Sequence, residues 1–211
     1  MNDIFLKEVI KKAWNKLYSS SIDSLPWVNT EFPSEIMGSF LEQLKTNSPK
    51  PKILDFGCGN GRLASYFYDN ECDVYLYDIS NVILDHCIQN GYNKEHVFFN
   101  LDEINMKFDG ILCWSVFHNI PNNEWNKYLQ LFYNMLNDNG LLTLSAFTQK
   151  DNNYHTASIV KSEIIGTDTY AVEMEIIQPL FKTIETGEFS YVENGRRWNR
   201  ILDYCIVKKQ N

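Results

Sequence analysis

The chain has 211 residues, of which 44% are hydrophobic and 14% aromatic, and this length fits a single globular domain built on one core. Its formal net charge is −8, which argues against nucleic acid as a partner because phosphate backbones attract clustered basic residues. The sequence has neither a signal-peptide pattern nor an apolar stretch long enough to cross a bilayer. We therefore expect a cytoplasmic protein without a membrane partner.

Two amphipathic helices are expected near the N-terminus. Apolar residues recur with helical spacing from Asp3 to Tyr18, and the stretch from Ser19 to Phe32 is loop-like. A second helix is expected to begin at Pro33. Its apolar face would consist of Ile36, Met37, Phe40, Leu41 and Leu44.

After Pro49-Lys50-Pro51, short β-rich segments alternate with segments of helical length, which is typical of a parallel sheet wrapped by helices. The strands that we expect are residues 52–56, 73–77, 96–100, 109–114 and 141–147. The clearest helices between them are residues 61–70, 81–90 and 123–137. Asp138-Asn139-Gly140 would stop the last of these helices.

The C-terminal part predicts a β-hairpin, because the extended segments 181–192 and 197–207 flank a turn at Asn194-Gly195. One strand of such a hairpin has to run against the parallel strands. The fold class that we predict is therefore α/β. It consists of a seven-stranded, mostly parallel, Rossmann-like sheet with helices on both faces and an antiparallel C-terminal hairpin strand.

A glycine-rich turn, Gly57-Cys58-Gly59-Asn60-Gly61, joins the first core strand to a helix. Glycines let a ligand approach the backbone, and the free N–H groups at a helix start favour a carboxylate or phosphate. The dinucleotide motif would place its third glycine at position 62, where this chain has Arg62, so NAD is disfavoured. Asp78 ends the second strand, where a carboxylate can accept hydrogen bonds from both hydroxyls of a ribose.

The segment from Ile53 to Gly61, Asp78, the region of Asp102 and the segment from Phe108 to Leu112 together resemble the class I, Rossmann-like S-adenosylmethionine-dependent methyltransferases. The resemblance covers about residues 52–208. It implies that the glycine loop contacts the methionine part of the cofactor, with Asp55 near its ammonium group. The cofactor-binding residues that it implies are Asp55, Gly57, Cys58, Gly59, Gly61, Asp78, Ile79, Asp102 and Trp114.

Some of these implied roles have alternatives. Asp78 would hold the ribose, and Asp102, or alternatively Glu103, would accept a hydrogen bond from the adenine amino group. Asp102 could equally be a solvated loop carboxylate. We interpret Cys58 as a packing residue rather than a nucleophile, because no base partner lies near it in the sequence.

The segment from Trp14 to Tyr18, with Leu25-Pro26-Trp27 and Pro33, resembles the start of small-molecule methyltransferases of the thiopurine and tellurite-resistance type. This resemblance implies a helix and an aromatic loop over the cofactor. We therefore interpret residues 1–48 as an N-terminal helical lid and residues 49–211 as the cofactor-binding core of one domain. Alternatively, Trp27 is only a helix-packing residue.

The end of the fourth strand lacks the Asn/Asp/Ser-Pro-Pro-Tyr/Phe segment with which enzymes that methylate bases grip a flipped base, so we expect no nucleic-acid partner. Ser115 and Thr148 stand where catechol-type enzymes have metal-binding carboxylates, and only Asp151 follows, so we expect no metal. Asp109 is expected to be structural. The predicted function is methyl transfer from S-adenosylmethionine to a small-molecule acceptor. The alternatives are an RNA or protein methyltransferase and a non-catalytic module that binds the cofactor.

His118 is the candidate catalytic residue, because it follows the fourth strand and an ordinary histidine pKa of about 6.5 suits a general base. Alternatively, its ring bonds a loop carbonyl and caps the turn that follows. Tyr154 and His155 compete for the catalytic role. Arg196 and Arg197 in the hairpin would attract an anionic acceptor.

Overall fold

Seven strands form one sheet in the order β3-β2-β1-β4-β5-β9-β8 in the computed structural model, which describes residues 3–20, 22–192 and 199–210. The strands β1 (Lys52–Phe56), β2 (Asp73–Tyr77), β3 (Val97–Phe98), β4 (Phe108–Trp114) and β5 (Leu136–Phe147) pair in parallel. The strand β9 (Asn199–Lys209) runs antiparallel between β5 and β8 (Phe181–Val192). The predicted fold class and C-terminal hairpin are thus confirmed, while the Asn194-Gly195 turn lies outside the described residues.

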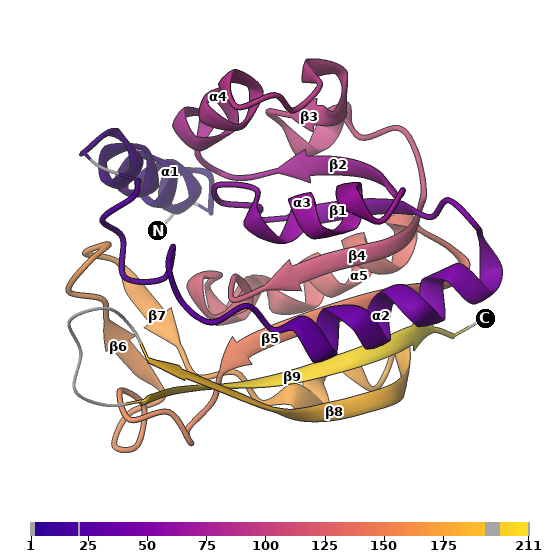
Figure 1. Cartoon of the computed structure of the whole chain (residues 1–211). Coiled ribbons are helices and arrows are strands. Elements are labelled where there is room, and N and C mark those ends of the chain that lie inside the picture. The colour runs from indigo at the N-terminus through magenta and orange to yellow at the C-terminus, as the bar shows by residue number, and fades with distance from the viewer. Residues whose placement is uncertain (1–2, 21, 193–198, 211) are drawn as a thin grey trace.

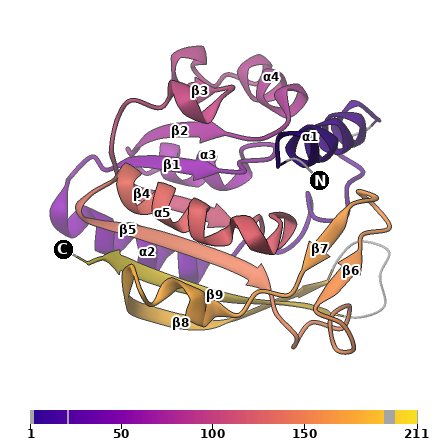
Figure 2. The same cartoon turned by 180° about the vertical axis from the view of Figure 1, so that it is seen from behind.

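Helices cover both faces of this sheet (Figures 1 and 2). The buried side chains of α2 (Ser34–Asn47) and α3 (Arg62–Asp69) join one core cluster, with Leu84 and Cys87 of α4 (Asn81–Gln89), and those of α5 (Trp125–Met135) join a second. The helix α2 buries the five residues that helical spacing predicts, Ile36, Met37, Phe40, Leu41 and Leu44. It therefore belongs to the core of the domain.

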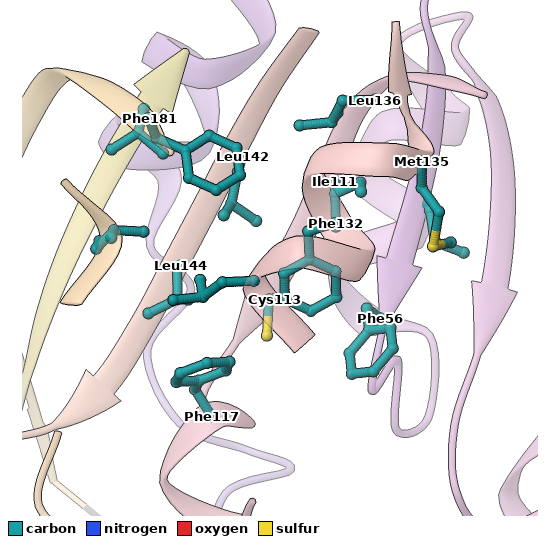
Figure 3. Packing of buried hydrophobic residues seen from close by; sticks show 14 of the residues in the cluster. Phe56, Ile111, Cys113, Phe117, Phe132, Met135, Leu136, Leu142, Leu144 and Phe181 are labelled. Atoms are coloured by element: carbon teal, nitrogen blue, oxygen red, sulfur yellow. The ribbon is translucent and has the colours of Figure 1, made fainter. Parts of the chain in front are cut away.

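The second core cluster lies between α5 and the sheet (Figure 3). Phe132 of α5 packs edge-on against Phe56 of β1, with ring centroids 4.8 Å apart. Cys113 and Leu144 bring β4 and β5 into the same cluster. The cluster fixes β1, β4 and β5 relative to one another, and this fixes where the loops at their carboxyl ends begin.

Two predicted boundaries are wrong, the first because of a distant residue and the second because of a local turn. The helix α5 ends at Met135, and β5 begins at Leu136, so the predicted stop at Asp138-Asn139-Gly140 lies inside the strand. Leu136 is fully buried and pairs with Phe108, which draws this segment into the sheet through a bulge. The strand β3 covers only Val97–Phe98 because the residues after it form a capped turn.

The connection from β5 to β8 contains no α-helix. It carries instead a small hairpin, β6 (Ile159–Lys161) and β7 (Asp168–Tyr170), and a 3₁₀ turn at Met174–Ile177. This hairpin and α1 (Asp3–Ser20) lie at the end of the sheet toward which the arrows of β2, β4 and β5 point (Figures 1 and 2). None of the described helices is both long enough and apolar enough to cross a bilayer.

We expect Phe40→Ala to lower the free energy of unfolding by about 3 to 5 kcal/mol, because the ring is fully buried against Phe67 and leaves a cavity. Urea unfolding followed by circular dichroism measures this change. Tyr68→Ala, at a side chain that is 67% exposed, is the matched control and should cost less than about 1 kcal/mol. Equal effects of the two variants would contradict the assignment of α2 to the core.

Candidate functional site

A cavity of about 860 Å³ opens at the carboxyl ends of β1, β2 and β4. Parallel α/β sheets bind ligands at this edge, and typical ligand cavities measure roughly 300 to 1,000 Å³. The lining comes from the strand ends with their loops, the segment before α2, the start of α5, the connection between β5 and β8, and the strands β8 and β9. The cavity is therefore large enough for a cofactor and a second small molecule.

The glycine loop forms part of the cavity wall, and its glycines differ in what they face. Gly57 has φ 78°, and an added Cβ would lie 2.4 Å from the side chain of Val116. Gly57, Cys58 and Gly59 line the cavity. Gly61 does not, because it faces Tyr92, whose hydroxyl donates a hydrogen bond of 2.8 Å to the Gly61 carbonyl. The side-chain hydrogen bond with Cys87, and then burial, raise the pKa of the Cys58 thiol, as expected of a packing residue rather than a nucleophile.

Asp55 presents a buried carboxyl group to the cavity. Its side chain is 2% exposed, and Oδ2 has no hydrogen-bond partner among the described residues. Burial, and then the nearby Asp78 carboxylate, raise the pKa of Asp55 to about 8. A buried carboxyl oxygen without a partner costs stability, so its place at a cavity wall fits a ligand with a cationic group.

Asp78 links the end of β2 to the glycine loop. Its Oδ2 accepts a hydrogen bond from the Gly59 backbone N–H at 3.1 Å, and its Oδ1 accepts one from the Ser80 backbone N–H at 2.9 Å. Burial raises the pKa of Asp78 to about 6, against the opposing effect of these N–H groups. Asp78 and Ile79 both line the cavity, and the two carboxylate oxygens together can accept about four hydrogen bonds, which leaves room for a ligand hydroxyl.

The neighbouring carboxylates Asp102 and Glu103 have different roles. Asp102 lines the cavity. Glu103 caps its own turn, because its Oε2 accepts from the Phe99 backbone N–H at 3.2 Å and its Oε1 accepts from the Asn100 side chain at 2.8 Å. Trp114, at the end of β4, lines the cavity and packs against Phe189 with ring centroids 5.9 Å apart.

His118 lines the cavity and is 5% exposed, with its ring 4.3 Å from that of Phe147. Its Nδ1 has no hydrogen-bond partner among the described residues, so this nitrogen does not bond a loop carbonyl. Burial, and then the positive charge of Arg200, lower the pKa of His118 to about 3. The expectation of a near-neutral pKa is therefore wrong, because it assumed a solvated ring.

The two competing candidates for the catalytic role, Tyr154 and His155, differ in whether they line the cavity. Tyr154 lines the cavity, and its hydroxyl donates a hydrogen bond of 2.6 Å to Thr169. His155 is exposed and does not line the cavity. Arg196 and Arg197 lie outside the described residues.

Arg200 and Ser115 are among the cavity residues that are missing from the sequence prediction. Arg200 is buried, and its alternation with buried Leu202 on β9 is the signal that could have marked it. Ser115 follows β4 with φ 58°, a left-handed backbone conformation that is unusual outside glycine. No sequence pattern predicts this conformation, because it depends on a distant residue. The Ser115 backbone N–H donates a hydrogen bond of 2.9 Å to the Ser145 hydroxyl of the neighbouring strand.

Asp109 lies at the opposite end of β4 and has a structural role. It accepts hydrogen bonds from the Lys52 backbone N–H at 2.9 Å and from the Asn137 side chain at 2.8 Å. Within the described ranges, no group of three or more His, Cys, Asp or Glu side chains is arranged to hold a metal ion.

The segment before α2 contributes Trp14, Tyr18 and Trp27 to the cavity lining. Trp14 stacks on Tyr18 with ring centroids 5.5 Å apart and meets Trp27 edge-on at 5.8 Å. The Ser80 hydroxyl, beside Asp78, donates a hydrogen bond of 2.7 Å to Asn15 of α1. This segment therefore covers the cavity, and Trp27 both packs on α1 and faces the ligand space. The lid that the sequence predicted, residues 1–48, included α2 as well. In the structure α2 packs in the core instead.

A family model described as a methyltransferase domain matches residues 30–197. No curated protein matches the chain. Among solved structures, 1,6-didemethyltoxoflavin-N1-methyltransferase from Burkholderia thailandensis, with 1,6-didemethyltoxoflavin and S-adenosylhomocysteine bound, has a TM-score of 0.72 at 16% identity, over 100% of this chain and 92% of that one.

Two further solved structures share the fold. Magnesium protoporphyrin IX methyltransferase (ChlM) from Synechocystis PCC 6803, with S-adenosylmethionine bound, has a TM-score of 0.65 at 17% identity, over 97% of each chain. TehB from Haemophilus influenzae has a TM-score of 0.61 at 18% identity, over 82% of this chain and 62% of that one. At these identities the likeness shows the fold alone.

We expect Asp55→Asn to stabilise the protein at about pH 7.5 by roughly 1 to 3 kcal/mol. The folded carboxyl group, with a pKa of about 8, is then mostly protonated, whereas the unfolded one is ionised, so folding has to take up a proton. This contribution of Asp55 favours folding below about pH 4 and is lost as the pH rises toward 8. Urea unfolding at both pH values measures the difference, which should vanish near pH 4.

Asp85→Asn is the matched control, because Asp85 is an exposed carboxylate on α4. It should change stability by less than about 0.5 kcal/mol at either pH. A destabilised Asp55→Asn variant at pH 7.5 would contradict the raised pKa.

Proposed function

The chain belongs to the methyltransferase domain family, and we propose that it transfers a methyl group from S-adenosylmethionine to a small-molecule acceptor. The observation that carries this proposal is the buried carboxyl group of Asp55, whose Oδ2 has no partner among the described residues, beside Asp78 and the glycine loop in one cavity. Such a group is suited to the ammonium of an amino-acid moiety, because an opposite charge restores the ionised carboxylate.

The residues around Asp55 fit the remaining parts of the cofactor. In this proposal the backbone of Gly57 to Gly59 contacts the methionine moiety, and Asp78 with Ile79 holds the ribose. Asp102 accepts from the adenine amino group, and Trp114 closes the cavity beside the methionine part. Gly61 acts indirectly, since its contact with Tyr92 fixes the end of the loop.

The bound cofactor supplies a methyl group made electrophilic by a positively charged sulfur. The contribution of the protein is then to align the acceptor with that group and to keep water away. Trp14, Tyr18 and Trp27 suit the second task, because they cover the cavity from the segment before α2. His118 stays neutral near pH 7, so we assign it a contact with the acceptor rather than the uptake of a proton.

Three observations support a small-molecule acceptor. Aromatic side chains line the cavity beyond the glycine loop, with Phe147, Tyr154 and Phe189 among them. The Burkholderia and Synechocystis enzymes of the same fold are named for toxoflavin-type and porphyrin substrates. The net charge of −8 weighs against the alternative of an RNA acceptor. A non-catalytic cofactor-binding module is the other alternative, and release of S-adenosylhomocysteine with any acceptor distinguishes it.

Titration calorimetry with S-adenosylhomocysteine tests the cofactor site. We expect one site per chain and release of about one proton at pH 7, because the ligand ammonium should ionise Asp55, whose pKa is about 8 without ligand. Repeating the titration in buffers with different ionisation enthalpies measures this release. Asp55→Asn should abolish it and weaken binding, whereas Asp85→Asn should change neither. A binding enthalpy that is independent of the buffer would contradict the proposed role of Asp55.

Turnover against pH, followed as S-adenosylhomocysteine release in an acceptor screen, tests the role of His118. With a pKa of about 3, its ring cannot give a kinetic limb near neutral pH. We therefore expect His118→Gln to lower the rate with a selected acceptor but to leave the shape of the profile unchanged between about pH 5.5 and about pH 9. A wild-type limb near pH 6.5 that disappears in the variant would restore the general-base hypothesis.

A further inference from the structure

A buried ion pair forms part of the cavity wall away from the glycine loop. Arg200 Nε donates a hydrogen bond of 2.8 Å to Asp151 Oδ2, and the two side chains are 6% and 0% exposed. The same Asp151 oxygen accepts from the Ile201 backbone N–H at 2.9 Å, and Oδ1 accepts from the Asn153 backbone N–H at 3.1 Å. Asp151 therefore holds the guanidinium group in a fixed position.

The pair is oriented with its positive end toward the cavity, because Arg200 lines the cavity and Asp151 does not. The guanidinium carbon lies over the Phe147 ring, 3.8 Å from its centroid, in a cation–π contact. A buried ion pair stabilises a fold no better than well-packed apolar residues of the same volume. Recognition of a ligand gives a reason for this arrangement that stability alone does not.

The cavity around Arg200 is aromatic. Phe147 stacks on Tyr154 and Phe189 stacks on Tyr191, in both cases with ring centroids 5.9 Å apart. All four residues line the cavity, and they come from β5, β8 and the connection between them. Flat rings of this kind provide walls for a planar, apolar molecule.

His118 adds a polar group to the same region. Its ring lies against Phe147, it is 5% exposed, and its Nδ1 has no hydrogen-bond partner among the described residues. A buried polar atom left without a partner costs free energy, which a ligand that bonds to it would recover.

Charges differ between the two parts of the cavity. Asp55 and Asp78 are the buried carboxyl groups on the glycine-loop side. The described lining contains further charged side chains: Arg62, whose charge interacts with Tyr191 of the aromatic part, and the exposed Lys161 and Glu163, which are opposite in sign. An anionic group is therefore favoured beside Arg200 and disfavoured beside the buried carboxyl groups of Asp55 and Asp78.

We propose that this aromatic part of the cavity selects a small aromatic acid, whose ring packs among the four aromatic side chains and whose anionic group faces Arg200. Asp151 is a positioning residue in this arrangement, and His118 hydrogen-bonds a second polar substituent of the same molecule. The inference rests on the proposed function, because it names the acceptor class for that site.

The test compares acids with neutral molecules of the same shape. Wild-type protein saturated with S-adenosylhomocysteine is titrated with benzoate, salicylate, anthranilate and 4-hydroxybenzoate, and with the corresponding primary amides. We expect at least one acid to bind about tenfold more tightly than its amide, because the charge-assisted contact with Arg200 is available only to the acid.

Variants then assign the preference to Arg200. Arg200→Gln alone would leave the Asp151 carboxylate buried without its ion-pair partner, so the variant of choice is the double substitution Arg200→Gln and Asp151→Asn. It should lose the preference for the acid while its affinity for S-adenosylhomocysteine changes by less than about twofold. Lys161→Gln removes an exposed cation at the same cavity and should keep the preference.

Equal binding of every acid and its amide to the wild-type protein would overturn this inference, and so would a double variant that keeps the preference. The wild-type comparison decides by itself if the double variant does not fold. Failure of the wild-type protein to bind S-adenosylhomocysteine would overturn the proposed function as well. Intact cofactor binding without a preference for acids would overturn the inference alone.

Discussion

The geometry of the site depends on two hydrogen bonds that Asp78 accepts, one from the Gly59 backbone N–H after β1 and one from the Ser80 backbone N–H after its own strand, β2. They hold the glycine loop against the end of β2, while Gly57 packs closely on Val116 from the end of β4. The same placement brings Asp78 near Asp55, and each carboxyl group is buried. Holding two buried carboxyl groups close together costs free energy, and the packed core behind the strands offsets this cost. The two groups favour a ligand with a cationic group in the cavity.

Polar atoms that are buried without a partner occur on both sides of the cavity. Among the described residues they are Asp55 Oδ2, Asn81 Oδ1, His118 Nδ1 and Thr143 Oγ1, and of these four residues Asp55 and His118 line the cavity. Native proteins leave few such atoms, so their occurrence in a cavity points to missing ligand contacts. The pKa of Asp55 rises and that of His118 falls for the same reason, because burial disfavours the charged form of each.

The two sides of the cavity are built by different kinds of structure. The glycine-loop side consists of turns that directly follow parallel strands, so the sheet fixes it. The other side depends on β9, on the connection that contains β6 and β7, and on the segment before α2. The sequences of loops and insertions vary more among proteins of one fold than those of the sheet strands do. This division explains how one fold can keep a cofactor site while the acceptor site takes a chemistry of its own.

The sequence by itself determined the features that depend on local pattern. These are the bounds of β1 and β2, the buried face of α2, the hairpin of β8 and β9, and the glycine turn with Asp78 at the next strand end. Only the tertiary structure decided which of Asp102 and Glu103 lines the cavity, and that Arg200 does so as well. It also decided the pKa of His118. The physical reason is that burial, ion pairing and strand pairing arise from residues far apart in the chain, such as Asp151 and Arg200, which no local period brings together.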